Sequence, residues 1–550
     1  MPNLNGVNNT REIYQSELID YPGQSSTVYD QYYEERKQFI YQAKSEHYFT
    51  RLKTKVELNV SYTDGNSDVP DFKTWDVLAL SGQFLSGQGG NSRFFRYLDE
   101  NVLDTRIKFD FPIGDVPGMN RKFIFGASRV YQDRDFQQYS YSLGATDSSG
   151  NIQSGSYLIP NNDLEAFLMP SEFNIESYFF QGIPKHRAKK FYFDDPNPAS
   201  HTIGNSEVLS AFTMLDYSIN FRWRASVGLR VEKTDLFADV YEYDKKGYGP
   251  NDFRRRFETD MYIANPGNFN VTKFLPSINI IYKLREEDKL AMNLRANYSR
   301  TTAYPTIREI TETNIFDFEL RSVVFGNSNL KEVDIDNFDV RWESFFKSGN
   351  SLSISGFYKD FNNHIELVNS IGGGYSWQNV DNSYVLGIEV EGKKNITSHL
   401  EFRANVALIN SETNFNFKTV EIINSVRTEV PGEIVKRKMF GQSPYVANAI
   451  LSYKWDLPKI LVTASYNIQG KKLVIASDEL APAVYELPRN LLDLKITKDL
   501  GKHFIIAVNI RDILNEPVTR EYDNDESLGK KNYDSFRWGT NYNLGLTYRL

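Results

Sequence analysis

The chain has 550 residues, and its 71 aspartate and glutamate residues outnumber its 63 lysine and arginine residues, for a formal net charge of −8. An acidic chain with a mean hydropathy of −0.49, and without an apolar run near the roughly 20 residues of a membrane helix, favours neither nucleic-acid binding nor a helical membrane protein. It contains no cysteine, which excludes disulfides and thiolate metal sites.

The N-terminal residues carry no recognisable export signal. Met1 to Asn9 is polar and has no apolar core of the kind that a signal peptide needs. We expect residues 1–35 to be an extracellular loop or a partial segment. Residues 36–550 are then expected to form a β-barrel that is incomplete at its N-terminal side.

Segments of strictly alternating apolar and polar residues recur along the chain. They are clear in Val56–Tyr62, Phe221–Val231 and Leu290–Tyr298. In Phe221–Val231 the odd positions are apolar, whereas the even positions are Arg, Ser or Gly. A period of two sends successive side chains to opposite faces of a sheet, so each segment predicts a strand with one apolar and one polar face.

Short and long polar connections alternate between these segments. We expect tight turns near residues 51–53, 116–119, 216–217, 286–288, 349–350, 397–398, 457–458 and 501–502. Longer connections are expected at 65–97, 145–203, 236–270, 301–333, 367–382, 413–438, 477–489 and 516–538. This rhythm is typical of a transmembrane antiparallel β-barrel, with tight turns at the periplasm and long loops outside. The all-β chain is predicted to hold about 17 strands.

The last segment is a candidate for recognition by the barrel-assembly machinery. Every second residue of this segment is apolar, so it predicts an amphipathic strand that ends on an apolar residue. These residues are Tyr542, Leu544, Leu546, Tyr548 and Leu550. The alternative is an ordinary edge strand of a soluble sheet, although such edges are commonly blunted by charge or proline.

Several motifs, in order, resemble those of TonB-dependent outer-membrane receptors of the Bacteroidetes type. The stretch Ala296–Pro305 is followed by Ile307-Arg308-Glu309, and Gly326–Lys331 precedes Asp336–Asp339. The further matches are Leu275–Ser277, Ser353–Asp360, Gly387–Glu391 and Gly441–Tyr445.

The resemblance implies the barrel portion of an importer in the outer membrane of a Gram-negative cell. This chain would supply about the last 17 strands of a 22-stranded barrel, without the signal peptide and plug domain of a complete receptor. The implied ligand is scarce, and is a siderophore, vitamin, glycan or peptide. The implied partners are outer-membrane lipid, lipopolysaccharide, the barrel-assembly machinery and the TonB complex, the last through a plug that is not in this chain.

Basic residues in two expected outer loops are candidate ligand-binding residues. A cationic mouth attracts an anionic ligand such as a ferric siderophore, or the phosphates of lipopolysaccharide. Ordinary solvated loop charge is the alternative. The candidates are Lys185, Arg187, Lys189, Lys190, Arg254, Arg255 and Arg256.

No catalytic, metal or cofactor motif stands out. None of the six histidines has the i, i+4 spacing that marks a zinc helix. The acidic cluster at Asp64, Asp68 and Asp71 lacks the pattern of a calcium loop. We therefore expect a non-enzymatic protein with no cofactor. An outer-membrane barrel enzyme, a passive porin-like barrel and a soluble β-rich binding protein are the alternatives.

Overall fold

The computed structural model describes most of the chain. Its described residues are 3–5, 26–78, 83–84, 92–114, 116–146, 152–153, 157–158, 175–180, 183–188, 190–194, 200–243, 261–263, 266–287, 289–317, 320, 322–369, 374–423, 426–477, 482–523 and 532–549. Within them, no helix combines the length and apolar character that a membrane span requires.

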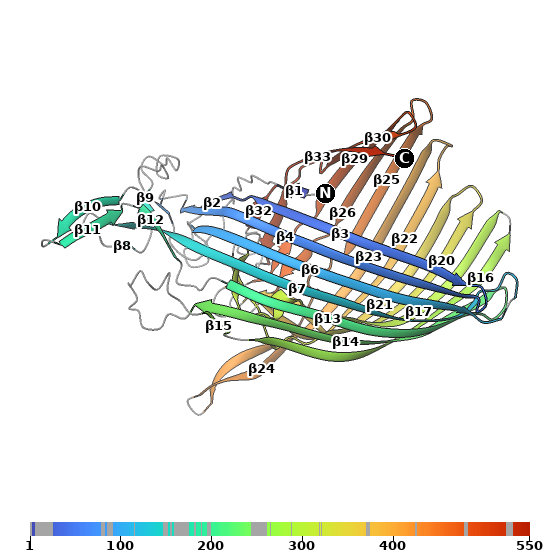
Figure 1. Ribbon diagram of the computed structural model, residues 1–550, viewed down its shortest axis with the longest axis horizontal. Coiled ribbons are helices and arrows are strands. Elements are labelled where there is room, and N and C mark those ends of the chain that lie inside the picture. Colours follow the sequence, from blue (N-terminus) through green and yellow to red (C-terminus); the bar gives the residue numbers. More distant parts are fainter. Residues whose placement is uncertain are drawn as a thin grey trace.

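Seventeen strands follow one another in a single antiparallel ladder, which Figure 1 shows as one curved wall of inclined strands. This agrees with the predicted all-β barrel and strand number. The strands are β3 (Glu34–Phe49), β4 (Thr54–Leu78), β6 (Ser92–Pro112), β7 (Arg121–Thr146), β13 (Ser200–Ser218), β14 (Trp223–Tyr243), β16 (Gly267–Glu287), β17 (Leu290–Ala303), β20 (Val333–Phe346), β21 (Ser351–Asn369), β22 (Tyr375–Asn395), β23 (Leu400–Ile423), β25 (Tyr445–Trp455), β26 (Ile460–Gln469), β29 (Arg489–Leu500), β30 (Phe504–Arg511) and β33 (Asn541–Tyr548).

Shorter elements lie at one end of this wall. They are β1 (Asn3–Asn5), β2 (Ser26–Gln31), β5 (Gln83–Phe84), β8 (Ile152–Gln153), β9 (Tyr157–Leu158), β10 (Ile175–Phe180), β11 (Ile183–Ala188), β12 (Lys190–Asp194), β15 (Met261–Ile263), α2 (Ile307–Ile310), β18 (Asn314–Asp317), β19 (Ser322–Phe325), β24 (Val426–Arg437), β27 (Lys472–Ile475), β28 (Val484–Glu486), β31 (Val518–Tyr522) and β32 (Asn532–Phe536). The strands β27, β28, β31 and β32 form a separate small sheet, and within the described residues β10 pairs only with β11. Among the described residues, no pairing joins the two ends of the ladder, β3 and β33.

The wall has two chemically different faces. Alternate residues such as Val227, Val340 and Ile388 are 49–58% exposed although they are apolar, as expected of a face in contact with lipid. The opposite face is polar. There, Asn448 donates a side-chain hydrogen bond to Asn405 (2.7 Å) and accepts one from Asn467 (2.6 Å), which ties three neighbouring strands.

Aromatic side chains border the apolar face at both ends. At the end that bears the tight turns, the turn end, Trp223 packs on Tyr282 and Phe504 on Tyr548, with ring centroids 4.5 and 5.1 Å apart. At the opposite end, the loop end, a row crosses β17, β20, β21 and β22. Its members are Tyr298, Phe338, Tyr358 and Tyr384. Two such girdles mark the two interfaces of a membrane-spanning barrel.

Seven of the eight predicted tight turns overlap observed strand connections. At 347–350, Gly349 supplies the positive φ of +77° that the reversal requires. The turn predicted at 216–217 is wrong, because β13 continues to Ser218 and the turn follows it. Asp216 faces Arg224 (2.5 Å) and Ser226 (3.0 Å) of β14, so its carboxylate belongs to the ladder rather than to a turn.

The predicted long loops are shorter than expected, because the strands continue through much of them. β4 runs to Leu78 and β23 to Ile423, well into segments expected to be loops. Beyond the apolar band the outer face of a strand meets water instead of lipid, and inner-face residues such as Phe72 pack on other parts of the protein, so the alternation of hydrophobicity disappears while backbone pairing continues. Figure 1 shows this paired region projecting at the loop end.

A new positive charge in the middle of the apolar band should affect the two faces of β22 differently. We expect Ile388→Arg, on the apolar face, to lower the free energy of unfolding by about 2–4 kcal/mol, because lipid cannot solvate the guanidinium. Glu389→Arg, on the polar face one residue later, is expected to cost much less. Unfolding of both variants by urea in lipid vesicles measures the difference. Equal costs would contradict the assignment of the faces.

Candidate functional site

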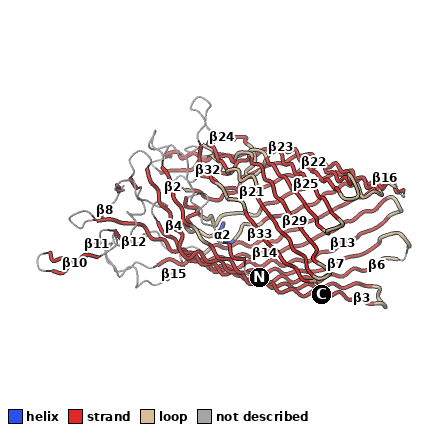
Figure 2. Tube along the Cα trace, turned by 90° about the horizontal axis from the view of Figure 1, so that it is seen from above, coloured by secondary structure: helices blue, strands red, loops and turns tan. Residues whose placement is uncertain are grey.

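Residues 304–331, which we call the inner segment, connect β17 to β20, and their described part (304–317, 320 and 322–331) folds against the polar face. The segment contains α2, whose capping box joins Thr306 and Glu309 reciprocally. Ile307 and Ile310 of α2 are buried in a cluster with Leu236 and Ala238 of β14. Figure 2 shows α2 amid the strands rather than beyond their ends.

Two glycines of the wall make room for this helix. A Cβ on Gly204 of β13 would lie 2.5 Å from Ile307 Cγ2, and one on Gly267 of β16 would lie 3.0 Å from Ile310 Cδ1. Real Cβ atoms essentially never lie as close as the first contact, and the second is tighter than nine in ten real Cβ contacts. The helix therefore docks where the wall carries no side chain.

The inner segment also reaches β4 and β6. The ring of Phe316 is stacked on Phe94 of β6 at 4.7 Å, and Phe72 of β4 completes the group. Arg96 of β6 donates a hydrogen bond to the Phe316 carbonyl oxygen. The segment thus touches β4 and β6 as well as β13, β14 and β16.

A third set of contacts holds the segment to β22 and β32. Val324 of β19 pairs in parallel with Tyr375 of β22. The hydroxyl of Tyr533 in β32 donates to the Leu320 carbonyl (3.1 Å) and shares a 2.7 Å hydrogen bond with the Tyr375 hydroxyl. With contacts on three parts of the wall, the inner segment bridges the interior near the loop end.

Charged side chains gather beside the segment, on the segment itself and on β6 and β7. Burial opposes ionisation of Asp317, but Arg308 at 3.0 Å and the backbone N–H of Leu320 outweigh it and hold the pKa of Asp317 below its usual value. Arg134 of β7 lies 3.6 Å from the carboxylate of Glu100 on β6, and Arg96 of β6 donates a hydrogen bond to Gln138 of β7 (2.7 Å). Guanidinium groups paired in this way donate directional hydrogen bonds to carboxylates and similar anions.

The basic residues predicted from the sequence lie partly in the described region. Lys185 and Arg187 are in β11, opposite Tyr178 and Glu176 of β10, and Lys190 begins β12, opposite Ala145 of β7. Lys189 and Arg254, Arg255 and Arg256 lie outside the described residues. The backbone therefore places three of the seven candidates at the loop end (Figure 1).

The C-terminal strand is present as predicted from its alternation. β33 pairs with β30 from Asn541 to Tyr548, and Tyr542, Leu544, Leu546 and Tyr548 are exposed on the apolar face. Leu550 lies outside the described residues. Among the described residues, no group of three or more His, Asp or Glu side chains converges as a metal site would.

The inward fold of residues 304–331 was not predicted from the sequence, which indicated only an outer connection at 301–333. Two local signals were available. Thr306 and Glu309 have the spacing of a capping box, and Ile307 and Ile310 place two apolar residues on one side of the helical turn.

A family model described as "TonB dependent receptor-like, beta-barrel" matches residues 2–513. No curated protein matches the chain. Among solved structures, the ferric-catecholate import receptor Fiu of E. coli is similar at 11% identity with a TM-score of 0.56. The match covers 94% of this chain and 65% of the receptor. This chain thus spans about two thirds of that receptor's length.

Two other solved structures share the fold. The siderophore receptor PiuA of Acinetobacter baumannii has a TM-score of 0.53 at 13% identity, over 96% of this chain and 77% of that one. The copper transporter OprC has a TM-score of 0.50 at 12% identity, over 98% and 76%.

The inner segment should be dislodged by one added methyl group. A Cβ on Gly326 would overlap the backbone carbonyl of Thr311, so Gly326→Ala must displace the segment. We expect faster hydrogen–deuterium exchange across the described part of 304–331 and unchanged exchange in β25 and β26. Gly356→Ala is the control, because nothing lies within 4 Å of its Cβ position. Unchanged exchange in Gly326→Ala would contradict the packing described.

Proposed function

This chain belongs to the TonB-dependent receptor-like β-barrel family, and we propose that it is the barrel of an outer-membrane receptor that imports a scarce ligand. The observation that carries the proposal is the inner segment, which bridges a polar interior near the loop end. A segment that crosses the interior narrows the passage, which suits a receptor that admits a selected ligand better than a wide open pore. The family assignment also favours a receptor over the barrel-enzyme alternative.

The driving force would come from the TonB complex, acting through a plug domain in the interior. Residues 296–309 and 326–339 support placing the barrel with receptors of the Bacteroidetes type. Fold does not determine the ligand, so siderophores, vitamins, glycans and peptides stay open.

We further propose that additional strands join β3 to β33 and complete a barrel of 22 strands. The outer edges of β3 and β33 carry backbone groups that lipid cannot hydrogen-bond, so both edges require partners within the membrane. Residues 1–35 would then belong to the loop end and residues 36–550 to the barrel.

Partners at the two ends of the wall follow from the same proposal. The strand that carries Tyr542, Leu544, Leu546, Tyr548 and Leu550 is the proposed signal for the barrel-assembly machinery. Lipopolysaccharide would surround the loop end. The basic residues Lys185, Arg187, Lys189, Lys190 and Arg254–Arg256 would attract the anionic ligand there.

Uptake by whole cells tests the import itself. Ferric catecholate, cobalamin, a maltooligosaccharide and a short peptide form a suitable panel, each with and without a protonophore. We expect one of them to enter by a route that needs both this gene and the proton gradient. Uptake that needs the gene but ignores the protonophore would instead indicate a passive porin-like barrel.

The basic residues proposed to attract an anionic ligand lead to a separate prediction. Replacing Arg254, Arg255 and Arg256 with Gln should slow capture of a ferric catecholate about tenfold at low ionic strength, since steering by charge is lost. Association kinetics measured on cells provide the test. The control replaces Lys454, Lys459 and Lys502, at the turn end, with Gln. Equal association rates of the ferric catecholate in both variants would show that the three arginines are ordinary solvated loop residues.

A further inference from the structure

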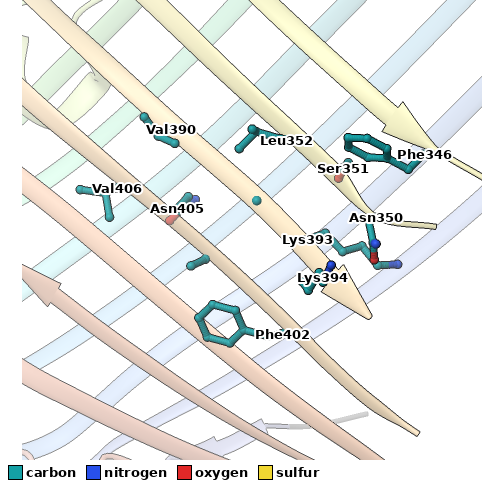
Figure 3. Close-up of a pocket in the computed structure, with 12 residues that line it drawn as sticks. Phe346, Asn350, Ser351, Leu352, Val390, Lys393, Lys394, Phe402, Asn405 and Val406 are labelled. Atoms are coloured by element: carbon teal, nitrogen blue, oxygen red, sulfur yellow. The ribbon is translucent and has the colours of Figure 1, made fainter. Parts of the chain in front are cut away.

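A hollow lies on the apolar face of the wall at its turn end. It has a volume of about 540 Å³ and lies over β20, β21, β22 and β23. This is within the range of roughly 300–1,000 Å³ that small-molecule sites occupy. Figure 3 shows Val390, Leu352, Phe346 and Phe402 around it, with Lys394 near the end of β22.

Small residues form the floor of the hollow. Gly392 of β22 is paired with Ala404 of β23, and both lie on the lipid-facing parity of their strands. Leu352 and Phe402 on the neighbouring positions are each 38% exposed, so large apolar side chains stand around a shallow centre. Such a shape accepts a flexible hydrocarbon chain along the strands.

Lys394 stands at the membrane-surface end of the hollow. It is exposed, lies two residues after Gly392 on the same face, and is one residue from the end of β22. Among the described residues, its ammonium group makes no ion pair or hydrogen bond. The adjacent Lys393 faces the interior instead and pairs with Glu401 at 3.0 Å.

Cations on the same outer face at the loop end are paired within the protein. Arg129 faces Glu207 (2.5 Å), Lys233 faces Asp235 (2.9 Å), and Arg300 faces Asp336 (2.7 Å). The carboxylates nearest to Lys394 in sequence and register, Glu391 and Glu401, point inward to Arg341 and Lys393. Lys394 therefore offers its charge to the membrane surface.

We propose that this hollow, which we call the turn-end groove, binds a phospholipid of the periplasmic leaflet. One acyl chain lies over Gly392 and Ala404, and the phosphate pairs with Lys394. The tight turns of such barrels face the periplasm, where the leaflet consists of phospholipid. An exposed cation at the depth of the headgroups attracts an anionic phosphate. This site concerns the lipid face and does not depend on which ligand the barrel transports.

Lipid retention by the full chain, measured by native mass spectrometry from detergent, tests the proposal with two probes. Dioleoylphosphatidylglycerol carries the phosphate, whereas dioleoylglycerol has the same chains without it. Gly392→Leu fills the groove, and it does so without strain because the nearest atom to a Cβ there is Leu352 Cδ1 at 3.9 Å. Lys394→Gln removes only the charge.

We expect Gly392→Leu to weaken retention of both lipids about tenfold, because it displaces several methylenes. Lys394→Gln should weaken only phosphatidylglycerol, by about fivefold. The controls are Gly356→Leu, at an open glycine on the same face of β21, and Lys498→Gln, a lysine on the same face at the turn end of β29. Both should retain lipid as the unmodified protein does.

Either of two results would overturn the proposal. Equal retention of phosphatidylglycerol by all four variants would show that the groove holds no particular lipid. An equal effect of Lys394→Gln on both probes would show that the lysine does not contact the phosphate. Heat-modifiable migration in gels confirms that each variant is folded, and the Lys394 variant alters no packed side chain.

Discussion

The backbone hydrogen bonds between neighbouring strands are the constraint from which the rest of this structure follows. Hydrocarbon offers no partner for a peptide group, so each strand within a membrane has to be paired on both sides. The ladder from β3 to β33 meets this demand at every internal strand. It also separates the side chains into two sets, one in lipid and one in the polar interior, and that separation produces the alternation seen in the sequence.

How much of the fold the sequence reveals depends on this separation. Leu290–Tyr298 is recognisable because its two faces meet different solvents, and turns such as 349–350 are recognisable because polar residues interrupt that pattern. Above the apolar band the outer face meets water instead of lipid, the inner face packs on other parts of the protein, and the backbone pairing persists without the alternation. The extension of β4 to Leu78 leaves no trace in the pattern for this reason. At Asp216 the sequence instead predicts a turn where the strand continues. Its carboxylate is typical of a turn, but here it is bound by Arg224 of the neighbouring strand.

The candidate site was less predictable than the fold, because its parts come together only in three dimensions. Phe72, Phe94 and Phe316 form one aromatic group although the third is more than 200 residues from the others in the chain. The glycines that receive α2 read as ordinary strand residues until the helix is in place. Of the seven basic candidates, only the backbone positions of Lys185, Arg187 and Lys190 are described, and their role in binding stays a prediction.

Consecutive residues on β22 show how the two solvents divide one strand. Lys393 and Lys394 are identical in chemistry and adjacent in sequence, yet the pleat sends one inward to Glu401 and leaves the other at the membrane surface. The interior can supply a carboxylate because a neighbouring strand carries one on the same face. In the part of the chain that the structure describes, the carboxylates nearest to Lys394 are bound by Arg341 and Lys393, so the proposed partner for its charge comes from the membrane. Because a cation and an apolar hollow lie side by side on this face, the proposed phospholipid would bind to the barrel through both its phosphate and its acyl chain.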